Sequence, residues 1–263
     1  MSKPVQKLVI SSLSKTFKQK ERTIQALSEI NLEVRDKEFV SILGASGCGK
    51  STLLRIIGGL ETPSEGTVLI NGSEIVDPGA DRGMVFQSYT LFPWLTVQKN
   101  IEFGMREKGM PALERAKIAE EYIEIVGLKG FENAYPKALS GGMKQRVAIA
   151  RALANDPDVI LLDEPFGALD MQTRSLMQEL LLDVWQRSQK TVILVTHDID
   201  EAIFMADRVV VMESRPGKIK EIIPIEFPRP RDYHIKTSKK FLDYKAQAVE
   251  LIRNETLKGM NAL

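Results

Sequence analysis

The sequence has little of several features that would assign a protein to a class. Its 263 residues include one cysteine, so no disulfide can form within the chain, and this use of cysteine suits a reducing compartment. No apolar run approaches the roughly 18 residues of a membrane-spanning helix, and residues 1–10 show no apolar stretch typical of a signal peptide. Lysine and arginine number 36 against 35 acidic residues, which gives no electrostatic reason to expect nucleic acid as a partner. We expect a cytosolic protein that meets a membrane only through a partner.

What the sequence does contain is, first, a complete phosphate-binding pattern. Residues 44–51, GASGCGKS, match G-x-x-x-x-G-K-[ST] and stand between an apolar strand-like run and a helix-forming run. The glycines allow backbone N–H groups to face phosphate oxygens, Lys50 would reach the β- and γ-phosphates, and Ser51 would ligate Mg²⁺. The alternative is a glycine-rich turn with a solvated lysine. We also expect the helix start and Lys50 to lower the pKa of Cys48 and make it alkylatable.

Polar side chains also follow three apolar runs. Asp163 ends the run VILLD and Glu164 comes next, so one carboxylate would hold Mg²⁺ and the other would orient or deprotonate a water molecule. His197 follows TVILVT, in a position parallel to that of Asp163 on an expected neighbouring strand, and Gln87 follows GMVF. The alternatives are surface acids that end a strand, a structural histidine and an uninvolved glutamine.

A second anion-binding pattern lies at residues 139–146, LSGGMKQR. Ser140 would cap a helix that starts at Gly141, and the two glycines leave its first N–H groups accessible to an anion. The alternative is a plain helix start. Glycine, however, costs about 1 kcal/mol relative to alanine in a helix interior, so two in succession require a reason.

The remaining periodicity predicts one α/β core with a helical insertion. Residues 5–43 are rich in β-branched runs and residues 66–75 contain an Asn-Gly hairpin signal, which together predict a largely antiparallel opening third. Residues 87–155 have a mainly helical pattern, and the strand–helix–strand order of residues 159–198 predicts a buried parallel sheet. A helix is expected from Pro111 to Gly127, with an apolar face formed by Leu113, Ala116, Ala119, Ile123 and Val126.

Taken in order, the segments GASGCGKST, VFQ, LSGGMKQR, VILLDEPFGALD and VTHD make the chain resemble the ATPase subunit of an ATP-binding cassette transporter. The resemblance covers roughly residues 8–230, and LSGG is the signature of that family. It implies an α/β P-loop NTPase core with a mainly parallel sheet, an N-terminal antiparallel β subdomain and an inserted α-helical subdomain. The implied domains are a cassette over residues 1–230, with its helical subdomain at about 88–155, and a C-terminal helical tail over 231–263.

The resemblance also implies a homodimer that holds two ATP molecules, in which the signature of one copy binds the γ-phosphate held by the other. The catalytic positions would be Glu164, His197, Lys50 and Gln87, with Glu164 as the base, and residues 168–170 would cross the dimer interface. The ATP-binding positions would be Phe17, which stacks on adenine, and Gly44, Ala45, Ser46, Gly47, Cys48, Gly49, Lys50, Ser51, Thr52, Ser140, Gly141, Gly142 and Gln145. Mg²⁺ would be held by Ser51, Gln87 and Asp163.

Residues 86–104 and 209–232 are similar to importer ATPases of the nitrate, sulfonate and taurine group. This similarity implies transmembrane permease subunits as partners, an extracytoplasmic solute-binding protein as an indirect one, and a peripheral location at the cytoplasmic face of the cell membrane. The aromatic-rich patch Tyr89, Leu91, Phe92 and Trp94 would be either buried core or part of a groove that receives a helix from the permease. The alternative functions are the ATPase of an exporter or extrusion complex and a soluble cassette protein in DNA repair or translation.

Overall fold

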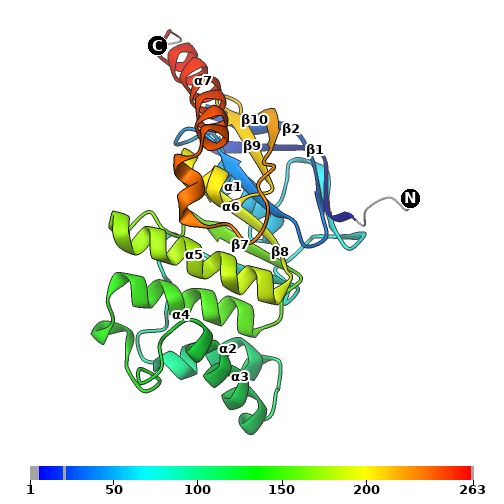
Figure 1. The fold of residues 1–263 in the computed structure, drawn as a ribbon. Coiled ribbons are helices and arrows are strands. Elements are labelled where there is room, and N and C mark those ends of the chain that lie inside the picture. The colour runs from blue at the N-terminus through cyan, green and yellow to red at the C-terminus, as the bar shows by residue number, and fades with distance from the viewer. Residues whose placement is uncertain (1–5, 20–21, 262–263) are drawn as a thin grey trace, which may run out of the picture. The chain divides into compact units, whose positions relative to one another are not determined.

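The computed structural model describes residues 6–19 and 22–261, which form two compact units (Figure 1). Unit 1 combines the chain up to residue 79 with the chain from residue 189, and unit 2 comprises residues 80–188. The signal-peptide expectation concerns residues 1–10, of which the first five lie outside the described residues. The expected domain limits at residue 230 and around residues 88–155 stay predictions.

The antiparallel part of unit 1 is a four-stranded sheet of order β2-β1-β4-β5. Its strands are β1 (Gln6–Gln19), β2 (Arg22–Arg35), β4 (Glu65–Ile70) and β5 (Ser73–Glu74). The turn between β4 and β5 is Asn71-Gly72, with φ of 52° and 79°. Two successive positive φ angles are those of a type I′ hairpin turn, which Asn-Gly favours. The predicted hairpin and antiparallel opening third are confirmed.

The parallel part of unit 1 places two chain segments at one sheet edge. Strand β3 (Phe39–Leu43) runs parallel to β8 (Thr191–Thr196), and both are buried over their full length. Leu43 pairs with Thr196, so the residues that follow both strands emerge side by side. On its other edge β3 runs parallel to β9 (Arg208–Glu213), which pairs antiparallel with β10 (Lys218–Pro224).

Four helical segments complete unit 1. They are α1 (Lys50–Ile57), α6 (Ile199–Met205), the 3₁₀ helix η2 (Tyr233–Thr237) and α7 (Lys239–Asn261). Phe241 and Ala248 of α7 are buried, and α7 packs against α6 and β9. The C-terminal segment is therefore part of the packed unit.

Unit 2 contains a parallel strand pair and a helical layer (Figure 1). Strand β6 (Arg82–Val85) pairs with β7 (Val159–Asp163), and the helices are α2 (Val97–Glu107), α3 (Ala112–Ile125), the 3₁₀ helix η1 (Pro136–Ala138), α4 (Gly141–Ala154) and α5 (Met171–Ser188). Ala119, Ile123 and Val126 pack in the core of this layer, as predicted. Leu113 was predicted on the same face but is 86% exposed. Among the described residues, no helix is both long and apolar enough to cross a membrane.

Candidate functional site

The phosphate-binding pattern forms a loop between β3 and α1. Ser46 and Gly47 at its tip are exposed, and the loop closes through a hydrogen bond from Cys48 N to Ala45 O of 3.3 Å. Lys50 is 5% exposed, and its ammonium group donates to Gly44 O at 2.8 Å and Ala45 O at 3.0 Å. The ammonium therefore lies within the loop, where it is placed to meet an anion.

Two features of this loop fit a polyphosphate. Gly49, at the N-cap of α1, has φ of 97°, and a Cβ there would come within 2.7 Å of Leu27 Cδ2, so only glycine is accommodated. Within the described residues, α1 has no side-chain cap and no acidic residue in its first turn. Its first N–H groups and the positive end of its dipole are therefore available to an anion.

Cys48 contradicts the expectation of a reactive thiol. Its side chain is 1% exposed, and burial raises the pKa of the thiol above its usual value. Lys50 and the backbone N–H groups do lower the pKa, as predicted, but burial outweighs them. A Cβ on Gly44 would lie 2.8 Å from Cys48 Sγ, which shows how closely the thiol packs under the loop.

His197 and Phe17 are the other predicted site residues of unit 1. His197 directly follows β8 and is exposed, at the same sheet edge as Gly44 because Leu43 pairs with Thr196. Phe17 lies in β1 and is half-buried. The Lys15 ammonium group lies 4.8 Å from the centre of the Phe17 ring, so one ring face already carries a cation. The sequence analysis missed Lys15, which also pairs with Glu61 at 2.6 Å.

In unit 2, Gln87 and Glu164 come together at the ends of neighbouring strands. Val85 of β6 pairs with Leu162 of β7, and two residues beyond each lie Gln87 and Glu164. The Gln87 amide donates to Glu164 Oε2 at 3.3 Å. Glu164 has φ of 45°, a left-handed conformation that is costly for a residue other than glycine and occurs most often at functional sites.

Asp163, the last residue of β7, is 7% exposed. A buried carboxylate at the carboxyl end of a parallel strand is typical of a group that holds a cation, whereas a surface acid would be solvated. The hydroxyl of Ser51 and the carboxylate of Asp163 are the hard oxygen donors that Mg²⁺ prefers. Among the described residues, no group of three or more His, Cys, Asp or Glu side chains is gathered as a metal site. An ion held by Asp163 would complete its coordination with other oxygen donors, such as phosphate oxygens and water, as Mg²⁺ commonly does.

Helix α4 begins as the sequence predicts. Ser140 is its N-cap, and its hydroxyl accepts a hydrogen bond from Met143 N at 3.3 Å. Gly141 is exposed, and a Cβ on Gly142 would lie 2.9 Å from Thr173 Cγ2, so Gly142 also allows close packing on α5. Within the described part of the chain, the first turn of α4 carries no acidic residue. The positive end of the helix dipole at this helix start therefore favours an anion. Close packing against Thr173 explains why residue 142 is a glycine.

Gln145 is buried within α4, and Asp170 is the N-terminal cap of α5. Gln145 is fully buried in α4, and within the described residues neither atom of its amide group has a hydrogen-bond partner. Asp170 caps α5 by accepting a hydrogen bond from Thr173 N at 3.0 Å. Hydrogen bonds from the side chain and the backbone of Thr173 lower the pKa of Asp170.

The aromatic-rich patch is half-buried and partly open. Phe92 lies 4.3 Å from Phe103 and 5.6 Å from Trp94 between ring centres, and Trp94 is 69% exposed. Beside them is a cavity of about 400 Å³, lined by Phe86, Phe92, Phe103 and Arg151 among others. Arg151, which the sequence analysis missed, donates to Thr90 O at 2.8 Å, and burial lowers its pKa.

Comparisons with known proteins show which family shares these sequence patterns. Residues 27–167 match the family model described as ABC transporter. The chain is 55% identical to an uncharacterized ABC transporter ATP-binding protein of Methanocaldococcus jannaschii, over 97% of this chain and 94% of that protein. It is 48% identical to the nitrate import ATP-binding protein NrtD of Synechocystis sp. over 97% and 98% of the two chains. It is also 48% identical to the aliphatic sulfonates import ATP-binding protein SsuB of Bacillus cereus over 92% and 94%.

Solved structures give the same result for the fold. A dimeric ATP-binding cassette in a post-hydrolysis state bound to ADP and Pi is similar with a TM-score of 0.74, at 39% identity over 84% of this chain and 100% of that chain. A second dimeric structure of the same cassette, described as a bacterial ABC transporter cassette, matches with a TM-score of 0.75 at the same identity and coverage. The predicted α/β P-loop NTPase fold is confirmed.

Proposed function

The chain belongs to the ABC transporter family as one of its ATP-binding cassettes, and on that premise we propose that it energises solute import through separate transmembrane subunits. It binds and hydrolyses ATP. The solute is small and anionic or organic, such as nitrate, a sulfonate or taurine. The names of two relatives, a nitrate importer and an aliphatic sulfonate importer, support this solute class.

The proposed assembly is a homodimer of cassettes attached to permease subunits at the cytoplasmic face of the cell membrane. An extracytoplasmic protein delivers the solute to the permease. Both similar solved structures are dimeric cassettes, which supports the homodimer. The exposed Trp94 and the neighbouring aromatic-lined cavity support a permease contact on unit 2.

The proposed chemistry is attack of water on the γ-phosphate of ATP. Phe17 stacks on adenine, the loop from Gly44 to Thr52 binds the phosphates, and Lys50 neutralises their charge. Glu164 orients the attacking water and accepts its proton, while His197 contacts the γ-phosphate. Ser51, Asp163 and Gln87 would hold Mg²⁺, which would offset phosphate charge when bound.

The remaining part of each site comes from the second copy of the chain. Ser140, Gly141 and Gly142 at the start of α4 bind the γ-phosphate held by the partner copy, with Gln145 supporting the helix from inside. Each copy therefore supplies two separate phosphate-binding helix starts to the dimer.

One observation supports a coupling between ATP hydrolysis and solute transport. The hydrogen bond of 3.3 Å from Gln87 to Glu164 joins the proposed catalytic base to the segment that continues into Phe92 and Trp94. A permease helix that displaces this segment would move Gln87 and thereby alter the surroundings of Glu164. Coupling of this kind requires a structural element that both sites bias.

The test is to co-express the chain with the membrane subunits encoded beside its gene and to measure co-purification and ATP hydrolysis. Trp94→Ser should reduce recovery of the permease while ATP hydrolysis by the isolated chain stays unchanged. Tyr135→Ser is the matched control, because Tyr135 is an exposed aromatic of the same unit and should change neither measurement. Recovery of ribosomes or DNA in place of a multi-span membrane protein would reject the proposal. Outward solute movement in reconstituted vesicles would favour an exporter.

A further inference from the structure

Helix α6 connects directly to His197 and is only seven residues long. Helices of this length are marginal by themselves, so their position depends on what holds their ends. At the N-terminal end, Asp198 is the cap and accepts from Glu201 N at 3.0 Å. The backbone of His197 immediately precedes this cap, so the position of α6 constrains where the backbone of His197 lies.

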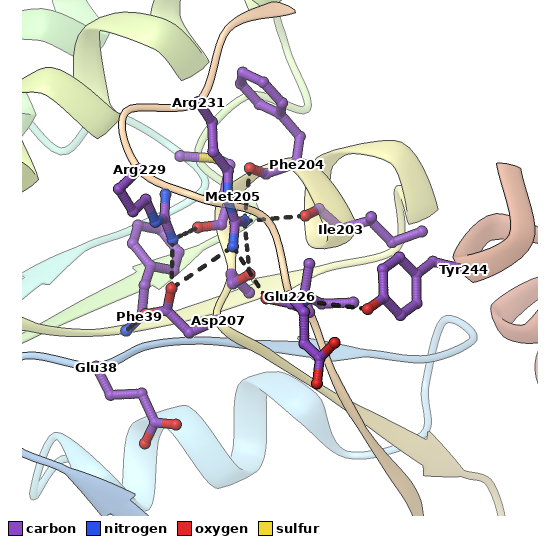
Figure 2. Close-up of polar contacts among 12 residues, drawn as sticks. Glu38, Phe39, Ile203, Phe204, Met205, Asp207, Glu226, Arg229, Arg231 and Tyr244 are labelled. Carbon is purple, nitrogen blue, oxygen red and sulfur yellow. Dashed lines mark hydrogen bonds and ion pairs between the residues drawn. The ribbon is translucent and has the colours of Figure 1, made fainter. Parts of the chain in front are cut away.

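The other end of α6 is capped by an arginine from far along the chain (Figure 2). The Arg231 guanidinium group donates to Ile203 O at 3.2 Å, Phe204 O at 3.0 Å and Ala206 O at 2.7 Å. The last carbonyls of a helix have no partner within the helix, and a cation is favourable at this end of the helix dipole. The side chain of Arg231 is 0% exposed, so these bonds are made out of contact with water.

A second arginine ties the same segment to the strand that leads into the phosphate loop. Arg229 donates to Met205 O at 2.6 Å and to Asp207 Oδ1 at 2.8 Å. The other oxygen of Asp207 accepts from Phe39 N, the first residue of β3, at 2.9 Å. Figure 2 shows Asp207 between Arg229 and Phe39, beside the end of α6.

Two lysines of the C-terminal segment reach other parts of α6. Lys245 pairs with Asp200 at 2.8 Å, close to the N-terminal end of the helix. The ammonium group of Lys236 lies 4.4 Å from the centre of the Phe204 ring. These two contacts place part of the C-terminal segment against α6.

From these contacts we propose that Arg231 is a positioning residue for ATP hydrolysis, holding α6 so that His197 stands at the γ-phosphate. We call residues Phe227–Arg231, with the contacts of Arg229 and Arg231 to α6 and Asp207, the C-terminal clasp. The inference rests on the proposed role of His197. The clasp joins α6, which follows His197, to β3, which leads into the phosphate loop.

The charge on Arg231 is retained at neutral pH. Burial and, to a smaller extent, the charge of Arg229 lower the pKa of Arg231 to about 9, although Asp207 opposes the shift. A charged guanidinium group makes shorter and stronger hydrogen bonds to carbonyls than a neutral donor does. A lysine at this position would carry the charge, but its single nitrogen would have to replace both Nη1, which donates to the three carbonyls at the end of α6, and Nη2, which donates to Ile225 O at 3.4 Å.

The first test compares the ATPase kinetics of the full-length chain with those of three variants. Arg231→Met should lower kcat by about ten- to a hundredfold, because misplacing a catalytic group by about 1 Å from a distant site can cost about a hundredfold. KM for ATP should stay within about twofold if the phosphate loop is unchanged. Arg231→Lys should recover part of the loss. Arg187→Met is the matched control, because it removes an exposed arginine that pairs with Asp183 on α5 of unit 2, and it should keep the kcat of the parent.

The second test asks whether Arg231 acts through His197. If the two residues act independently, the losses of turnover in the double variant should multiply. If they act as a unit, Arg231→Met should add no further loss in a His197→Ala background. Single-turnover hydrolysis of ATP labelled at the γ-phosphate gives the required sensitivity. Hydrogen exchange of Arg231→Met should show faster exchange at the amides of α6, with those of α1 unchanged.

The outcomes separate this inference from the proposed function. If His197→Ala keeps full turnover, the proposed role of His197 is wrong. If His197→Ala loses turnover and Arg231→Met does not, only the positioning role of Arg231 is wrong. Full multiplicative loss in the double variant, or equal acceleration of exchange in α1 and α6, would make Arg231 a general stability residue. Failure of both Arg231 variants to fold would overturn the inference in the same way.

Discussion

At the scale of single residues, Glu164 shows the strongest sign of functional placement. It adopts a left-handed backbone conformation with φ of 45° and accepts a hydrogen bond from Gln87. Strain of this kind costs about 1–3 kcal/mol and persists only where surrounding structure enforces it. Glu164 directly follows the buried Asp163, and its left-handed backbone conformation allows the two adjacent carboxylates to point in different directions. The proposed roles of base and metal ligand are consistent with that separation.

Cys48 supplies a prediction at this scale. N-ethylmaleimide should react with Cys48 of the folded chain more slowly than with free N-acetylcysteine at pH 7.5, because the thiol is buried and its pKa is raised. The rate should increase with pH, since a raised pKa shifts formation of the thiolate to higher pH. Mass spectrometry over a time course at pH 7.5 and pH 9 measures both effects.

The control for Cys48 is the same chain unfolded in urea, where the thiol should react like the free compound. A folded-state rate at pH 7.5 equal to or above that of the free thiol would show that the helix start and Lys50 outweigh burial. That result would restore the expectation drawn from the sequence.

At the scale of elements, the start of α4 has two separable duties. Ser140 caps the helix, and the proposed function also places Ser140 against the γ-phosphate held by the partner copy. A substitution that preserves the cap but changes the charge would affect only the second duty. Aspartate does so, because Asp and Ser are comparably good N-caps while a carboxylate repels phosphate.

We therefore predict opposite patterns for Ser140→Ala and Ser140→Asp. Ser140→Ala should lower stability by about 1 kcal/mol, the usual cost of a lost N-cap, and weaken ATP-dependent dimerisation only modestly. Ser140→Asp should keep the stability of the parent and abolish the dimer. Thermal unfolding and size-exclusion chromatography with ATP, both in a Glu164→Gln background that stops turnover, give the two measurements. An ATP-dependent dimer of Ser140→Asp equal to that of the parent would contradict the proposed contact.

Much of the element structure could be predicted because it depends on local chemistry. Asn71-Gly72 fits a type I′ turn, and unbroken apolar runs predict the buried strands β7 and β8. Leu113 shows the limit of periodicity. Its spacing matches the apolar face of α3, but the core cluster of unit 2 contacts that helix only from its later turns, and nothing covers Leu113 within the described residues.

The parts of the candidate site that could not be predicted depend on long-range contacts. Sequence patterns place Gln87 and Glu164 after strands, but only the pairing of β6 with β7 brings the two side chains within hydrogen-bond distance. Burial of Cys48 depends on the packing around the loop, where Met212, distant in sequence, approaches Gly44 closely. The partners of Arg231 are main-chain carbonyls, which every residue carries, so no sequence motif marks them.

At the scale of the whole molecule, the candidate site residues divide between the two units. Unit 1 carries the phosphate loop with α1 and His197, while unit 2 carries Gln87, Glu164 and the start of α4. Unit 1 thus offers the start of α1 to an anion, and unit 2 offers the start of α4. In the proposed dimer the two helix starts on one chain serve different ATP molecules, which explains why one chain carries both.

This division predicts complementation between two inactive variants. Lys50→Ala should abolish phosphate binding by its own loop, and Ser140→Asp should abolish the contribution of α4 to the partner copy. In a mixed dimer, the loop of the Ser140→Asp chain meets the intact α4 of the Lys50→Ala chain, so one of the two sites is complete. Mixing equal amounts should therefore restore at most about half of the parent activity, because neither variant forms the ATP-dependent dimer with itself and each mixed dimer has one of two sites intact.

A second mixture provides the matched control for this complementation. Lys50 and Glu164 are proposed to serve the same ATP molecule, so Lys50→Ala mixed with Glu164→Gln leaves both sites of every dimer defective. Phosphate release measured at a fixed total concentration of protein should stay at background for this pair and rise only for the Lys50→Ala and Ser140→Asp pair. Equal activity of the two mixtures, or full activity of Ser140→Asp alone, would mean that one copy of the chain builds the whole site, because neither result can arise if the start of α4 acts only on the nucleotide of its partner.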